Sequence, residues 1–160
     1  MEASIDRFEN NSTGTKCDFH IRSSSEEKTS RIDIALYAGV EEDALANVLS
    51  ELDMETTRAI ISINGRKREF FRHNNADGNI GGFVESSLVL KNCYVELNAI
   101  AFGKGVIKDM YIKDVLIANS SGIYTRSLPK KGYSQLIDEK PLDMLLSDKF
   151  IQKTEKMEKS

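Results

Sequence analysis

A six-residue period between Cys93 and Met110 is the feature that most constrains how this chain can fold. The first position of each six is small, and the third is small or aliphatic, the third positions being Val95, Ala101 and Ile107. A fixed period with small residues at one phase is typical of a coil in which each repeat buries one face on the next. We therefore predict that these three third-position residues share one interior.

Two segments around this period match a known pair of motifs. Gly78–Glu85 reads Gly-Asn-Ile-Gly-Gly-Phe-Val-Glu, and Asn92–Gly103 begins Asn-Cys-Tyr-Val. Together they resemble a hexapeptide-repeat family common in phage and bacterial genomes, over about residues 76–124. The resemblance implies a left-handed parallel β-helix. The best-known left-handed β-helices are acyltransferases, so the resemblance also raises an enzymatic alternative.

The repeat is short and loses its phase after Met110, where similar residues recur every five positions instead of six. A coil of this kind takes about three sixes, so the stretch makes roughly two coils, fewer than the three or so repeats that a free-standing solenoid needs. The remainder of the chain or a second subunit must then cover its strand edges. The alternative is a plain antiparallel sheet, because residues alternate in polarity from Cys93 to Ala101.

The region before the repeat shows the alternating and helical patterns of a mixed segment. Alternation predicts a β-hairpin of strands 17–21 and 31–37. A helix is predicted after Gly39, with acidic residues in its first turn and an apolar face formed by Leu45, Val48, Leu49 and Leu52. Strands 59–63 and 66–72 are predicted on either side of an Asn64-Gly65 turn.

These patterns predict an α+β fold in what is one domain overall. Its parts are a flexible tail over 1–15, an N-terminal α+β segment over 16–75, the repeat-type β region over 76–126, and a linker with a C-terminal helix over 127–160. Pro141 suits the first position of that helix. Its apolar stripe is expected to be buried and consists of Leu142, Leu145, Leu146 and Phe150.

Composition and charge exclude several classes of protein. The 160 residues carry a net charge of −3 with both signs mixed, which gives nucleic acid no broad footprint. No apolar run reaches the roughly 18 residues of a membrane span. No signal peptide is visible, so we expect a cytoplasmic protein with two reduced thiols, Cys17 and Cys93; secretion by a signal-less route is the alternative. No metal or cofactor motif is present in the sequence.

The densest cationic cluster, Arg66-Lys-Arg-Glu-Phe-Phe-Arg72, is the main candidate binding site. Arginine side chains grip phosphates with two parallel hydrogen bonds, so we assign ligand binding to Arg66, Arg68, Arg72 and the adjoining His73. The spacing of Arg68 and Arg72 also resembles the Arg-x-x-x-Arg motif of PilZ domains, which bind cyclic di-GMP. The second PilZ motif is matched only imperfectly, with Ile100 in place of its serine. The simpler interpretation is a charged edge strand.

The functional expectation is a small non-enzymatic binding or assembly protein of phage or bacterial type that associates with itself. The first alternative is a module that binds a nucleotide or another phosphorylated small molecule through Arg68 and Arg72. The second alternative is a hexapeptide acyltransferase-like enzyme, in which His73 beside Asp77 would act as general base.

Overall fold

The computed structural model describes residues 5–10, 14–24, 28–125 and 139–141. They form two compact units that divide between Glu69 and Phe70, and each unit is considered by itself. No helix among these residues is long and apolar enough to cross a membrane.

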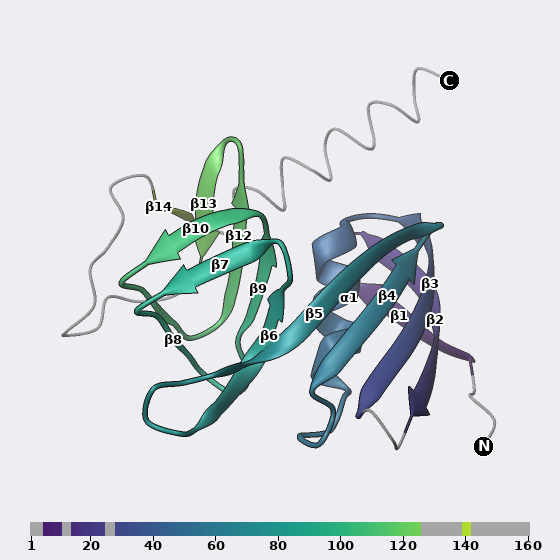
Figure 1. Ribbon diagram of the computed structural model, residues 1–160. Coiled ribbons are helices and arrows are strands. Elements are labelled where there is room, and N and C mark those ends of the chain that lie inside the picture. Colours follow the sequence, from purple (N-terminus) through teal and green to yellow (C-terminus); the bar gives the residue numbers. More distant parts are fainter. Residues whose placement is uncertain (1–4, 11–13, 25–27, 126–138, 142–160) are drawn as a thin grey trace. The chain divides into compact units, whose positions relative to one another are not determined.

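The first unit is a mixed sheet with one helix packed against it (Figure 1). Its elements are β1 (Ile5–Asn10), β2 (Thr15–Ser24), β3 (Thr29–Ala38), α1 (Glu41–Ser50), β4 (Arg58–Ile63) and β5 (Arg66–Asn74), the last of which continues into the second unit. The strands lie in the order β1-β2-β3-β4-β5. β1, β2 and β3 form an antiparallel meander, whereas α1 makes the crossover that sets β4 parallel to β3.

The helix is anchored by three of the four apolar residues that its sequence periodicity predicts, whereas the fourth, Leu52, lies beyond the end of α1 and is half-buried. Leu45, Val48 and Leu49 are fully buried, as are Ile32 and Ile61 of the sheet. The helix begins after a tight approach of two backbones, since a Cβ on Gly39 would lie 2.2 Å from the Cα of Thr15. The Thr15 hydroxyl accepts a hydrogen bond from the Val40 amide at 2.9 Å and so fixes the start of α1.

The second unit winds its strands into parallel coils. The first coil is β6 (Ile80–Glu85), β7 (Leu88–Lys91) and β8 (Tyr94–Val95), and the second is β9 (Ile100–Gly103), β10 (Gly105–Lys108) and β11 (Tyr111–Ile112). Equivalent strands pair in parallel, β6 with β9, β7 with β10 and β8 with β11. β12 (Val115–Asn119) begins a third coil beside β9 before β13 (Gly122–Thr125) turns back antiparallel and pairs with β14 (Glu139–Pro141).

The coil encloses one apolar interior. Val95, Ala101 and Ile107 all lie in it and are buried, which confirms the prediction made from their shared phase. Successive coils also repeat their corners: Asn92 and Asp109 both have positive φ, and their side chains are joined by a 2.7 Å hydrogen bond. On the β8/β11 side, the rings of Tyr94 and Tyr111 stack at 5.3 Å and 9°.

Several expectations from the sequence are corrected by this architecture. The α+β class is wrong, because the described residues are mostly strand with a single helix. Parallel pairing of β6, β9 and β12 excludes the plain antiparallel alternative for that stretch. The predicted coil length of about three six-residue repeats is also wrong. Val84 pairs with Ala101, seventeen residues later, and Ala101 pairs with Leu116, fifteen residues later.

The boundaries of the predicted segments also differ from those in the structure. The predicted tail over 1–15 contains strand β1, which extends the expected hairpin to a three-stranded meander. The division between units falls within β5 rather than at residue 75. Pro141, predicted to start the C-terminal helix, is instead the last residue of strand β14. The apolar stripe of that helix, Leu142, Leu145, Leu146 and Phe150, lies outside the described residues.

Candidate functional site

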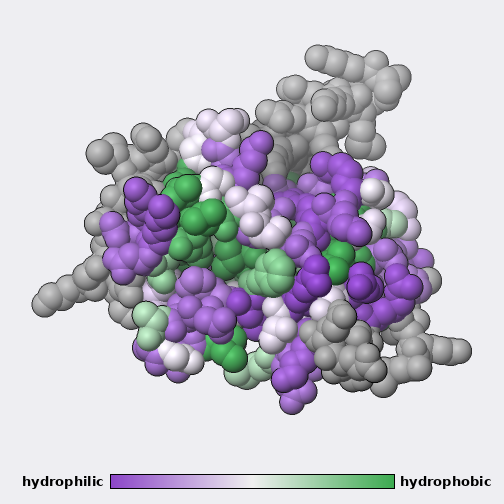
Figure 2. Space-filling view, viewed as in Figure 1, coloured by the Kyte–Doolittle hydropathy of each residue, from purple (hydrophilic) through white to green (hydrophobic). Residues whose placement is uncertain are grey.

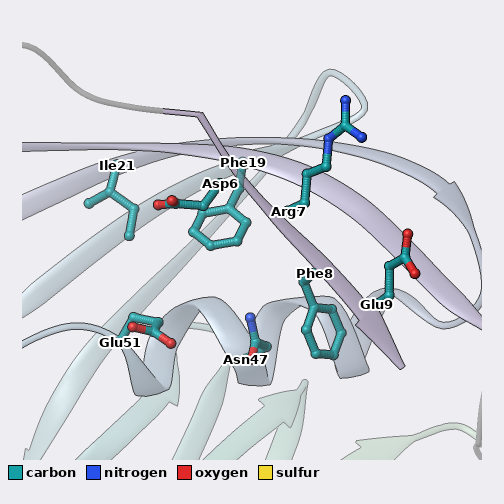
Figure 3. Close-up of a pocket in the computed structure, with 8 residues that line it drawn as sticks. All are labelled: Asp6, Arg7, Phe8, Glu9, Phe19, Ile21, Asn47 and Glu51. Atoms are coloured by element: carbon teal, nitrogen blue, oxygen red, sulfur yellow. The ribbon is translucent and has the colours of Figure 1, made fainter. Parts of the chain in front are cut away.

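A hollow of about 520 Å³ lies between the edge strand β1 and helix α1 in the first unit (Figure 3). We call it the β1–α1 hollow, and its lining residues are Asp6, Arg7, Phe8, Glu9, Phe19, Ile21, Asn47 and Glu51. Its volume falls within the range of about 300–1,000 Å³ that is usual for small-molecule pockets.

The floor of the hollow is apolar because of strand register. Asp6 pairs with Phe19 and Phe8 with Cys17, so these side chains project from the same face of the sheet toward α1. Phe19 is 5% exposed, whereas Phe8 is half-buried and points at the helix in Figure 3. The aromatic surface that the floor offers to an apolar group is therefore chiefly that of Phe8.

The rim of the hollow is polar and acidic. Asn47 and Glu51 lie four residues apart at the end of α1 and so share one side of the helix. Glu51 and Asp6 are both exposed carboxylates on the helix side of the sheet. The last turn of α1 holds no basic residue, so the negative end of the helix dipole adds to these charges.

The one cation of the lining is turned away from the floor. Arg7 projects from the opposite face of β1 (Figure 3), and its Nε lies 3.3 Å from Oδ1 of Asp18. The rim consequently favours a positively charged group, and the floor favours an apolar stem attached to it. The lining residues are carboxylates, one arginine, one asparagine and three apolar side chains. Among the described residues, no group of three side chains is placed to hold a metal ion.

The arginines predicted to bind phosphate have protein partners. In the first unit, Arg66 and Arg68 both bind Glu41 of α1, at 2.5 Å to Oε1 and 3.2 Å to Oε2 respectively. Arg68 is mostly buried by this arrangement, with 17% of its side chain exposed. A phosphate at this position would compete with the Glu41 carboxylate for the two guanidiniums.

The other two residues of the predicted cluster belong to the second unit. The guanidinium of Arg72 lies over the ring of Phe83, 4.3 Å from its centroid. His73 is half-buried, and this burial lowers its pKa despite a hydrogen bond to the backbone of Cys93. Asp77, suggested as its catalytic partner, is exposed and accepts a 2.9 Å hydrogen bond from the amide of Asn79.

The β1–α1 hollow was missed in the sequence because one of its walls lies in the predicted tail. The signal that points to it is the single aromatic Phe8 between charged residues of the first ten. Glu51 lies at the end of the predicted helix as one of several acidic residues, and Asn47 stands outside the apolar face of that helix. Neither feature identifies a site until the strand register brings them together.

Comparison of the chain with protein-family models, with curated proteins and with solved structures finds no match. The assignment of a function therefore rests on the geometry of the chain itself.

Proposed function

We propose that this protein is a non-enzymatic binding module and that its ligand occupies the β1–α1 hollow. The observation that carries the proposal is an apolar floor of Phe8, Phe19 and Ile21 under a rim that holds Asp6 and Glu51. The ligand class that fits is a primary amine or guanidinium on an apolar stem, because the floor takes the stem and the carboxylates take the charge. We place it in the cytoplasm, where its cysteines, which form no disulfide, would stay reduced.

Titration calorimetry with n-hexylammonium tests the proposal, with n-hexanol as the uncharged comparison. Binding should be measurable for the amine, weaker for the alcohol, and weaker at high salt because exposed charges are screened. Asp6→Asn and Glu51→Gln should each weaken binding by about two- to fivefold, since both carboxylates are exposed. Glu55→Gln is the matched control, because it removes one charge from an exposed residue outside the lining. Equal binding of amine and alcohol by all variants would contradict the proposal.

Self-association is a second candidate function, favoured by a different observation. Val89 and Val106 are cross-strand neighbours on β7 and β10 and are 49% and 55% exposed. Figure 2 has apolar surface in this region of the second unit. Within the described part of the chain, no strand pairs with the outer edge of either β7 or β10. Exposed apolar side chains on an open sheet are typical of a surface that another chain covers.

A further inference from the structure

The inner edge of β1 is paired with β2, from Ile5 opposite His20 to Asn10 opposite Thr15. Its outer edge has no strand beside it among the residues that the structure describes. An edge strand directs alternate N–H and C=O groups away from its neighbour, and these groups can pair with an incoming strand. The open edge of β1 is also one wall of the β1–α1 hollow.

A strand added to this edge would place half of its side chains on the helix side of the sheet. Those side chains would continue the row that Asp6 and Phe8 already form, beside Asn47 and Glu51 of α1 (Figure 3). An extended peptide lying between an edge strand and a helix therefore gains affinity from backbone pairing and specificity from alternate side chains.

We propose that the ligand of the β1–α1 hollow is an extended basic peptide segment that adds as a strand to the open edge of β1. The inference rests on the proposed function. On the helix side, the peptide presents lysine or arginine to Asp6 and Glu51, next to an aliphatic residue over Phe8. Its backbone N–H and C=O groups form hydrogen bonds with the outward C=O and N–H groups of β1.

The charges on the other face of β1 restrict the partner further. Arg7 is bound to Asp18, whereas Glu9 is exposed on the same face. Charged side chains on an edge strand oppose pairing with a neutral or like-charged strand. A basic segment is the complementary partner, because it offers cations to Asp6, Glu9 and Glu51 while Arg7 is already paired.

The probe is a capped octapeptide of sequence Lys-Thr-Val-Thr-Lys-Thr-Val-Thr, whose lysines and valines share one face of a strand. It is compared with two forms N-methylated at alternate residues, one form for each set of alternate amides. Only one set faces β1 in a paired strand, so one methylated form should bind at least twentyfold more weakly while the other stays within about twofold. Hydrogen exchange should slow at amides of residues 5–10 when the parent peptide binds.

Variants of the protein tie this binding to the hollow. Asp6→Lys should weaken peptide binding at least tenfold, and Glu55→Lys, which makes the same charge change outside the lining, should leave it within about twofold.

If n-hexylammonium binds but both methylated peptides bind like the parent and β1 gains no protection, strand addition is overturned and the hollow remains a binding site. If neither the amine nor any peptide binds, the proposed function fails as well. If, without any peptide, the protein is a dimer in which the β1 amides already exchange slowly, a second copy of the chain occupies the edge of β1. The proposal of a peptide ligand is then overturned.

Discussion

Asn75 closes the open edge of the first coil by imitating a strand. Its side-chain amide donates to the Val95 carbonyl at 2.8 Å, and its side-chain oxygen accepts from the Val95 amide at 2.9 Å. Both residues are buried, so water does not replace these bonds. One side chain thus satisfies the two backbone groups of β8 that face away from β11.

Replacement of Asn75 by alanine should destabilise the protein by about 1–3 kcal/mol for each backbone group left without a partner. Urea unfolding followed by circular dichroism measures the loss. Asn98→Ala is the matched control, because Asn98 is exposed in the same unit and should change stability by no more than about 0.5 kcal/mol. Equal losses from the two variants would refute the capping role of Asn75.

His73 should make stability depend on pH. Its pKa in the folded protein lies below the ordinary value of 6.5, chiefly because of burial. The unfolded chain then binds more protons than the folded one as the pH falls below about 6.5, so stability should decrease there. Because the imidazole is only half-buried, the slope should be well below the ~1.4 kcal/mol per pH unit that one whole proton gives. Urea midpoints between about pH 7.5 and 5 give the slope. His73→Gln should flatten it relative to His20→Gln, and an unchanged slope would argue against a lowered pKa of His73 in the folded protein.

At the scale of elements, close packing between coils is set by glycine. A Cβ on Gly82 of β6 would lie 1.7 Å from the carbonyl oxygen of Ala99, a backbone atom that cannot easily move. Gly82→Ala should therefore cost about 1–3 kcal/mol or more through overpacking. Ser86→Ala, at an exposed turn in the same unit, serves as the control in thermal unfolding. A variant as stable as the control would show that the coils can separate at little cost.

Local patterns predicted most elements of the first unit. The alternation in 17–21 and 31–37 and the apolar face of 45–52 correspond to β2, β3 and α1, because each pattern reflects burial of one side of a single element. β1 was missed because its only apolar side chains, Ile5 and Phe8, do not alternate.

The sequence predicts which residues face the interior of the coil better than it predicts the number of residues in each coil. Side chains alternate within each strand, so Val95, Ala101 and Ile107 were identified as interior from the sequence alone. The number of residues at each corner depends on local φ values such as those of Asn92 and Asp109. That number decides whether equivalent strands recur after seventeen or fifteen residues, and periodicity does not report it.

The candidate site could not be predicted because it depends on two elements far apart in sequence. The sequence predicts that Arg68 binds a ligand, but Glu41, 27 residues earlier, binds it in the folded unit. Likewise, Asp6 and Glu51 become part of one rim only when β1 pairs with β2 beside α1. Charge clusters in sequence indicate which groups are present and not which remain available after folding.

At the scale of the whole molecule, self-association predicts a native mass above the 18.0 kDa of one chain. Val89→Thr combined with Val106→Thr should shift the protein toward the monomer, because threonine keeps the shape of valine and removes apolar surface. Met54→Thr, at another exposed apolar residue, should leave the mass unchanged. Native mass spectrometry at several concentrations makes the comparison, and a monomeric parent protein would rule out this candidate.

The stacked rings of Tyr94 and Tyr111 give the second unit an optical label of its own. The chain contains no tryptophan, so tyrosine dominates its near-ultraviolet absorption. Two such rings held nearly parallel at 5.3 Å couple their electronic transitions, and the coupling disappears once successive coils part. Near-ultraviolet circular dichroism can therefore follow the winding of the coil in the unmodified protein, with no dye, isotope or engineered fluorophore.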